Sequence, residues 1–315
     1  MILYKNGPLV TIAMVTYNSS KYVRKAIESV LDSTYENFEL IISDDNSTDG
    51  TWEIVNSFSD SRILKIRNVE NVGEYTNRNN CIDLAKGEYF LFIDGDDVIT
   101  PHGLDVYMTY ALKFPEIPLI IEKGYFNNII FPDLLEPHEI FKFHDAKVGL
   151  LNSSFSSNLF RTSYIKQNKL SIKYFSGDDD IRLKIASVTK VLFISGWLTW
   201  PRETPGQASA KINPVCGIAE QLEMFQEIRN IGQDSIQDFI LKKLIYLRYH
   251  LLKAIVKNLV YKGGFVTHSR MNKKIDFNYF DSSIIRIIRD YINSEKSAEI
   301  KYNPDKPLVM NKYVD

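Results

Sequence analysis

Apolar runs of strand length that end in polar turns constrain the fold of this chain more than any other feature. Three of them are Leu9 to Val15, Phe38 to Ser43 and Tyr89 to Ile93, and Ile63 to Ile66 is a shorter one. Segments with the helical spacing of apolar residues alternate with these runs, at residues 20–31, 52–58 and 75–85. Strands that are apolar on both faces and alternate with helices are typical of an open parallel sheet covered by helices. The sequence therefore predicts an α/β fold with a mostly parallel sheet and helices on both of its faces.

Polar clusters follow three of the predicted strands at the point where each strand ends. They are Thr16 to Asn18, Asp44 to Asn46 and Asp94 to Asp97. In open parallel sheets, ligands bind in the crevice beyond the carboxyl ends of the strands. We therefore expect the three clusters to converge on one ligand site.

The cluster Asp94-Gly95-Asp96-Asp97 brings three carboxylates to the end of one strand. One interpretation is a solvated acidic loop that caps the next helix, because Asp is common in turns. The other is a site for Mg2+ or Mn2+, which bind one or two protein carboxylates and complete their shell with water and substrate phosphate.

Two chemistries fit an apolar strand that ends in this acidic turn. A phosphatase of the haloacid-dehalogenase type needs Asp94, Asp96 and a Thr or Val at position 98, and Val98 satisfies it. That class carries its nucleophile strand near the start of the domain, whereas here a long α/β segment precedes Tyr89. Transfer of a sugar from a nucleotide donor is the other chemistry, and the upstream strings favour it.

Four strings resemble the inverting family 2 glycosyltransferases of GT-A fold, which is a Rossmann-like fold. They are TYN at 16–18, ELIISDDNSTDGT at 39–51, NVGEYTNRN at 71–79 and GEYFLFIDGDD at 87–97. The resemblance is close from Leu9 to about Pro101, looser to about Ser209 and absent beyond. It implies transfer of a sugar, dependent on Mn2+ or Mg2+, from a nucleotide sugar, with UDP as the expected nucleotide, to a glycan or glycolipid hydroxyl in cell-envelope polysaccharide biosynthesis. A non-catalytic nucleotide-sugar sensor on the same fold is the contrasting class.

The resemblance assigns the nucleotide base to the first two turns. Tyr17 is expected to contact the base, Thr16 and Asn18 to lend polar atoms, and Asp45 to accept a hydrogen bond from a ring N–H. The alternatives are a core aromatic for Tyr17 and a helix cap for Asp45, and Asp44 competes with Asp45.

The resemblance also assigns donor and metal contacts around the acidic turn. Arg78 is expected to bind the donor, although a solvated helix charge is the alternative. Asp94 is expected at the ribose and the water shell of the metal, and Asp96 at the metal itself. Gly95 lets the backbone approach the ligand closely, and Asp97 orients the turn or caps the next helix.

The general base of the family is the Asp of a Glu-Asp pair that begins a helix. Asp178 matches when Ile181 and Lys184 are aligned at the third and sixth positions after it, and Gly177 then replaces the usual Glu. Alignment on the Gly-acid-Asp string makes Asp179 the base instead. Helix phase favours Asp178.

A later segment, residues 202–209, resembles a loop that closes over the diphosphate in relatives. Arg202 is a candidate for donor binding, but Thr204 stands where His is usual, which puts a contact from that position in doubt. Trp197 and Trp200 precede this loop, and core packing is the expected role, with an acceptor cleft as the alternative.

We divide the chain into a GT-A domain at 1–213 and a mainly helical C-terminal module at 214–315. Between Asp238 and Asp276 every formal charge is positive. The module is therefore interpreted as a contact to an anionic membrane surface, a contact to another subunit in a homo-oligomer, or a structural layer of helices.

Composition excludes several classes of protein. The formal net charge is -1, with 44% hydrophobic and 24% charged residues, which argues against binding of nucleic acid. Cys81 and Cys216 lie far apart, so a disulfide framework or a zinc site is not indicated. The sequence shows neither a signal peptide nor an apolar run long enough to span a bilayer. The expected location is the cytoplasm, with possible peripheral contact at the inner face of the membrane.

Overall fold

The chain is described from a computed structural model, which covers residues 7–123, 131–143, 150–151, 153–173, 177–202 and 214–262. Side chains at 177, 178, 214–216 and 252–262 lie outside the description.

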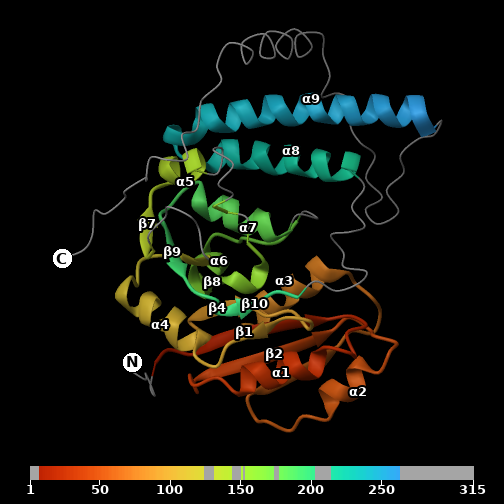
Figure 1. The fold of residues 1–315 in the computed structure, drawn as a ribbon, viewed down its shortest axis with the longest axis vertical. Helices are drawn as coiled ribbons and strands as arrows, with labels where there is room; N and C mark the ends of the chain where they lie inside the picture. The colour runs from red at the N-terminus through yellow and green to blue at the C-terminus, as the bar shows by residue number, and fades with distance from the viewer. Residues whose placement is uncertain are drawn as a thin grey trace.

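A twisted sheet of eight strands forms the centre of the described part of the chain, in the order β3-β2-β1-β4-β8-β6-β9-β7 (Figure 1). Its strands are β1 Val10–Thr16, β2 Phe38–Asp44, β3 Ile63–Arg67, β4 Tyr89–Phe92, β6 Leu119–Lys123, β7 Asp133–Leu135, β8 Asn158–Arg161 and β9 Val191–Ser195. The first four strands are mutually parallel, which confirms the prediction. Strand β8 is antiparallel to both β4 and β6, and β7 is antiparallel to β9. A second sheet pairs β5 Val98–Ile99 with β10 Thr199–Trp200.

Helices cover both faces of the large sheet. They are α1 Val23–Leu31, α2 Thr51–Asn56, α3 Glu74–Leu84, α4 Gly103–Lys113, α5 Pro137–Phe143, α6 Thr162–Gln167, α7 Gly177–Ala186, α8 Pro214–Ile231 and α9 Gln237–Lys262, with short 3-10 helices η2 Phe155–Ser157 and η4 Asp234–Ile236. Helices α1, α2 and α4 contribute to one hydrophobic cluster, whereas α3 and α5 to α9 contribute to the other. The predicted layered architecture is confirmed.

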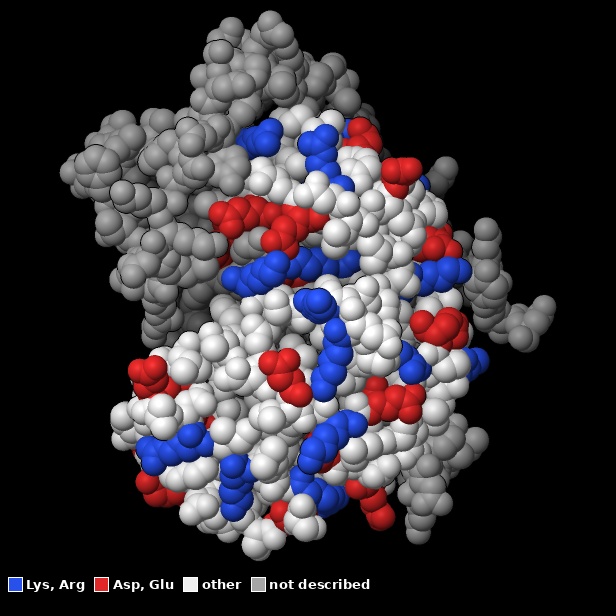
Figure 2. Space-filling view, turned by 180° about the vertical axis from the view of Figure 1, so that it is seen from behind, with Lys and Arg blue, Asp and Glu red and all other residues white. Residues whose placement is uncertain are grey.

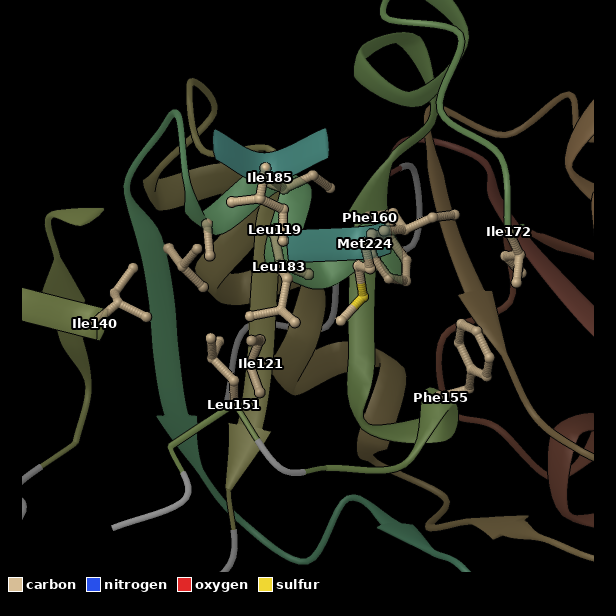
Figure 3. Close-up of a cluster of buried hydrophobic side chains, with 14 of the residues drawn as sticks. Leu119, Ile121, Ile140, Leu151, Phe155, Phe160, Ile172, Leu183, Ile185 and Met224 are labelled. Carbon is tan, nitrogen blue, oxygen red and sulfur yellow. The ribbon is translucent and has the colours of Figure 1, made fainter. Parts of the chain in front are cut away.

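The two clusters lie on opposite faces of the sheet because side chains alternate along a strand. In β1, Ile12 and Met14 belong to one cluster, while Ala13 and Val15 belong to the other. Figure 3 shows part of the second cluster, where side chains of β6, β8, α7 and α8 meet. Each fully buried aliphatic or aromatic side chain contributes about 1.5–3 kcal/mol, so this cluster holds the C-terminal helices to the sheet.

Helices α8 and α9 lie side by side next to α7 (Figure 1) and share the core of the preceding domain. In α9 the buried positions Ile240, Leu244 and Leu247 follow helical spacing and join the cluster of α3 and α5 to α8. This packing supports the structural role among the three interpretations of the module. The domain boundary at 213 and 214 stays a prediction, and residues 263–315 of the module lie outside the described residues. Of the helices that the structure describes, none has both the length and the apolar character to cross a membrane.

Candidate active site

The polar turns after β1 and β2 are hydrogen-bonded to each other. The Asp45 amide donates to the Thr16 carbonyl at 2.8 Å, and the Asn18 amide donates to Ser47 Oγ at 2.9 Å. In return, Asn18 Oδ1 accepts from the Thr48 amide at 2.9 Å. Asn18 has φ 51, in the left-handed region that Asn tolerates better than most residues. The predicted convergence of the first two turns is therefore confirmed.

The acidic turn after β4 is held against the end of β1. The Gly95 amide donates to the Val15 carbonyl at 3.2 Å. A Cβ atom on Gly95 would lie 2.8 Å from Cγ2 of Thr16, so a larger residue does not fit. Glycine is thus required here because the turn backbone packs closely against the end of β1. Close approach of the same backbone to a ligand stays a prediction.

Arg78 supplies the positive charge that the acidic turn needs. Its Nη1 and Nη2 atoms each lie 2.8 Å from an oxygen of Asp94, and Nη2 lies 2.8 Å from Glu74. The guanidinium carbon also lies 4.9 Å from the ring centroid of Phe92 and 4.4 Å from that of Phe155. The residue is 2% exposed, so the alternative of a solvated helix charge is wrong. Burial opposes the charge, but the contacts with Asp94 and Glu74 outweigh it and hold the pKa of Arg78 above its usual value.

This ion pair changes how the site is understood. Both oxygens of Asp94 face the guanidinium, and Arg78 is too buried to offer its own face to a ligand in this conformation. Arg78 therefore acts on the site through Asp94, and its direct contact with the donor stays a prediction. The pair also speaks against the phosphatase chemistry, because a nucleophilic Asp94 would need an uncommitted oxygen.

Asp97 orients the turn, one of the two roles predicted for it. Its carboxylate accepts from Ser156 Oγ at 2.7 Å and from the Arg202 amide at 2.9 Å. Burial, followed by repulsion from Asp94, raises the pKa of Asp97 to about 7. The turn is thus tied to η2 and to the segment after β10.

The donor set at the turn fits a cation that relies on its substrate for ligands. Among the described residues, no three His, Cys, Asp or Glu side chains are grouped closely enough to hold a metal ion. Asp94 is committed to Arg78 and Asp97 is buried, while Asp96 is only half-buried. A hard divalent cation held by one or two carboxylates, water and substrate phosphate matches these residues, whereas a cage made only of protein does not.

Tyr17 and Asp44 have different environments. Tyr17 is 53% exposed, so the core-aromatic alternative is wrong and its ring is open to a ligand. Asp44 is fully buried and accepts from Thr16 Oγ1 at 3.0 Å and from the Ser47 amide at 3.0 Å. Asp44 and the Thr16 hydroxyl therefore stabilise the turn, and a direct contact of Thr16 with the base stays a prediction.

Asp45 connects the second turn to the loop before α3. Its carboxylate accepts from Asn68 Nδ2 and from the amides of Val72 and Gly73, each at 2.9 Å. Helix α2 is preceded by Gly50, so the helix-cap alternative for Asp45 is wrong. A carboxylate has about four acceptor positions, and three of those of Asp45 are used; Asp45 is buried as well, and its contact with a base N–H stays a prediction.

The acidic cluster predicted to hold the general base lies at the start of α7. Asp178 is the second residue of the helix, and its side chain lies outside the description. Asp179 pairs with Arg182 at 2.6 Å. Asp180 is fully buried and contacts Lys184 at 2.5 Å, and Lys184 also contacts Glu227 of α8 at 2.9 Å. The neighbours of Asp178 are therefore engaged within the protein.

A buried polar layer that local sequence patterns do not predict lies beside the acidic turn. Ser157 lies 3.3 Å from the Thr199 hydroxyl, which lies 3.4 Å from Glu122 at the end of β6. Burial raises the pKa of Glu122 to about 7 and lowers that of Lys123 to about 7. In the sequence, the serine-rich string at 153–157 is the visible signal of this layer.

The segment after β9 lies beside the acidic turn as well. Arg202 reaches Asp97 through its backbone amide, and its guanidinium carbon lies 5.0 Å from the ring centroid of Tyr22. Thr204 lies outside the described residues. Trp197 and Trp200 are 64% and 60% exposed, so the expectation of core packing is wrong.

Known proteins resemble the N-terminal half of the chain in sequence. The model of the family "Glycosyl transferase family 2" matches residues 11–163. Over 89 residues the chain is 45% identical to UDP-Glc:alpha-D-GlcNAc-diphosphoundecaprenol beta-1,3-glucosyltransferase WfaP of Escherichia coli, covering 28% of this chain and 36% of the relative. Over 110 residues it is 44% identical to the putative colanic acid biosynthesis glycosyl transferase WcaA of Escherichia coli (strain K12), covering 34% and 39%. The matches thus span well under two thirds of these curated relatives.

Solved structures agree in fold. S. aureus TarS 1-349 in complex with UDP-GlcNAc superposes with a TM-score of 0.61 and 18% identity, over 80% of this chain and 73% of that TarS fragment. The mannosyltransferase PcManGT from Pyrobaculum calidifontis, in complex with GDP-Man and Mn2+, gives 0.59 and 13% identity, over 92% and 81%. The fold is the glycosyltransferase fold that the resemblance implied. The family match over 11–163 spans just under half of the chain, and this segment is similar to glycosyltransferase family 2.

Proposed function

We propose that the chain transfers a sugar from a UDP-sugar to a hydroxyl of a glycan or glycoconjugate, with inversion at the anomeric carbon. The observation that carries this proposal is the set of mutually bonded turns at one sheet edge, where the Arg78–Asp94 pair lies beside half-buried Asp96. The UDP-Glc named as the donor of WfaP and the UDP-GlcNAc bound to TarS support the choice of UDP.

The donor is held by residues of the first, second and fourth strand ends. Exposed Tyr17 stacks on the base, and Asp45 accepts the ring N–H with its remaining acceptor position. Asp94, oriented by Arg78, accepts a ribose hydroxyl. Asp96 would hold Mn2+ or Mg2+ together with the diphosphate. The cation, when bound, stabilises the negative charge that develops on the leaving diphosphate.

Asp178 is the proposed general base, which takes the proton of the acceptor hydroxyl. A base that lies across the sugar carbon from the diphosphate leads to inversion, because attack and departure then occur on opposite faces. Asp179 is paired with Arg182 and Asp180 with Lys184, which favours Asp178 among the three. General-base help of this kind is worth roughly 10²- to 10⁴-fold in rate.

A thermal-shift screen tests donor binding. UDP-Glc, UDP-GlcNAc and GDP-Man are added to the protein with and without Mn2+. We expect one UDP-sugar to stabilise the protein when the metal is present, by about 2.7 kcal/mol at a hundredfold excess over Kd. Asp96→Asn should remove the metal-dependent part, whereas the control Asp83→Asn, an exposed carboxylate on α3, should not. Absence of stabilisation by every donor would contradict the proposal.

Transfer is tested separately from binding. Asp178→Asn should keep the donor-induced thermal shift and lose transfer, whereas Asp179→Asn should keep both. Full transfer by Asp178→Asn would exclude that residue as the base. Donor binding by the wild-type protein without transfer to any acceptor would favour a nucleotide-sugar sensor instead.

We further propose electrostatic contact of α9 with an anionic membrane surface, which would bring the site to a lipid-linked acceptor. The apolar positions Ile240, Leu244 and Leu247 of α9 are buried in the core, so this part of the helix would make the contact by charge without insertion. On the face shown in Figure 2 acidic and basic side chains are interspersed, which limits the expected affinity. We expect the protein to co-sediment with anionic but not with neutral liposomes, and we expect 0.5 M salt to abolish this binding.

The homo-oligomer is tested separately, by size-exclusion chromatography with light scattering.

A further inference from the structure

Two exposed tryptophans stand together beside the acidic turn. The ring centroids of Trp197 and Trp200 lie 5.9 Å apart, with 37° between the ring planes. Both side chains are more exposed than any other large hydrophobic side chain among the described residues except Val69. Exposing so much apolar surface costs free energy in water, and such surfaces commonly bind a partner.

The backbone that carries these two rings, residues 197–200, is held in place by buried contacts. Between the two tryptophans, Leu198 and Thr199 point inward and are buried. The Thr100 amide donates to the Leu198 carbonyl at 2.8 Å, and the Thr199 hydroxyl contacts Ser157 and Glu122 in the buried polar layer. The exposed rings are therefore attached to a backbone that the sheet pairing and buried hydrogen bonds hold in place.

The same backbone segment is connected directly to the proposed transfer site. Trp200 pairs with Val98 across β5 and β10, and Val98 directly follows Asp97. Two residues after Trp200, the Arg202 amide donates to Asp97 at 2.9 Å. The tryptophan pair is thus joined through β5 to the turn that carries Asp94 and Asp96.

We propose that Trp197 and Trp200 form a stacking platform for a pyranose ring of the acceptor. This inference rests on the proposed function and names the chemistry of its second substrate. A pyranose has an apolar C–H face and a polar edge, and an indole ring pairs an apolar face with a polar N–H. A lipid chain would need a larger apolar surface, and in the described residues no other large exposed hydrophobic side chain lies on β5, β10 or the turn from 196 to 198.

Kinetics with defined probes test the platform. The acceptors are short alkyl diphosphates that carry GlcNAc, Glc or Gal, and the control ligand is the same alkyl diphosphate without a sugar. The variants are Trp197→Ala, Trp200→Ala, their combination and Trp200→Phe. Tyr246→Ala, an exposed aromatic on α9, is the matched control. Metal-dependent donor hydrolysis without acceptor reports the donor site for each variant.

We expect the double alanine variant to raise the acceptor KM by about tenfold or more, given the usual strength of aromatic stacking. The donor KM and the rate of donor hydrolysis should stay within about twofold of the wild type, a margin smaller than the loss of a single stacking contact. Trp200→Phe should recover most of the loss of Trp200→Ala, and Tyr246→Ala should behave as the wild type.

Three results would overturn the platform. They are an unchanged acceptor KM, a parallel rise in the donor KM, or an equal loss of affinity for the sugar-free alkyl diphosphate, which would indicate contact with the lipid instead. If the wild-type protein neither hydrolyses nor transfers any donor, the proposed function fails. In that case quenching of tryptophan fluorescence by the sugar-bearing probes still decides the platform, because its absence in wild-type protein would refute stacking.

Discussion

The ion pair between Arg78 and Asp94 allows the sharpest prediction on the energetics of the site. Arg78→Gln removes two contacts of 2.8 Å to Asp94 and leaves that carboxylate beside Asp97 without its counter-charge. Breaking a buried ion pair by removing one partner costs about 3–5 kcal/mol. Because the Asp94 side chain keeps 26% exposure and can be partly hydrated, we expect a loss of about 2–3 kcal/mol.

The assay is a double-mutant cycle of urea unfolding at pH 7, followed by tryptophan fluorescence. Arg78→Gln and Asp94→Asn are measured singly and together, and the double variant should be more stable than additivity predicts by at least about 1 kcal/mol. The coupling should persist in 0.5 M NaCl, since buried pairs are screened much less than exposed ones.

The matched control is the exposed pair of Arg24 and Glu28 on α1, whose closest charged atoms lie 4.0 Å apart. Its cycle should give a coupling below about 0.5 kcal/mol. If the coupling of Arg78 and Asp94 is equally small, then Arg78 does not hold the carboxylate, and the electrostatic account of the acidic turn is wrong.

Three further predictions follow from the packing and charges of the site. Gly95→Ala should lower stability by about 1–3 kcal/mol, as overpacking does, and weaken the donor-induced thermal shift, because its Cβ would clash with the end of β1; a variant as stable as the wild type would show that the turn can move. Glu122→Gln should flatten the pH dependence of stability. Burial raises the Glu122 pKa from 4.5 to about 7, so its stabilising effect is present below about pH 4.5 and is lost as the pH rises to about 7, a loss of up to about 3 kcal/mol; parallel urea-unfolding profiles of variant and wild type would refute this. Lys184→Met should cost about 3 kcal/mol in urea unfolding, since it leaves Asp180 buried without a counter-charge. Burial raises the pKa of Asp180, so protonation at lower pH relieves the penalty on its unpaired carboxylate. The cost of Lys184→Met should therefore be smaller at pH 5 than at pH 8, and an equal cost at both pH values would contradict this prediction.

Much of the N-terminal half of the fold follows from local patterns. The apolar runs at 9–15, 38–43 and 89–93 predict β1, β2 and β4 closely, because a strand that is buried on both faces needs an apolar residue at almost every position. Strand β8 was missed, although it lies in the middle of the sheet between β4 and β6. It has four residues and follows a serine-rich string, so its sequence is too short to show the alternation of apolar residues typical of a strand. It forms because it pairs with β4 and β6 on its two sides.

Some features of the site were likewise predictable from local sequence, whereas others depended on tertiary contacts. The sequence by itself placed the polar turns at strand ends, since parallel connectivity brings those ends to one edge. Only the tertiary structure decided that Arg78, sixteen residues before Asp94, would point inward to that carboxylate. The exposure of Trp197 and Trp200 could likewise not be predicted from the sequence, because an aromatic residue in or beside a short strand can face either the core or the solvent. Local patterns along the chain encode the elements and their order, whereas ion pairs, exposed faces and shared cores depend on which distant elements meet.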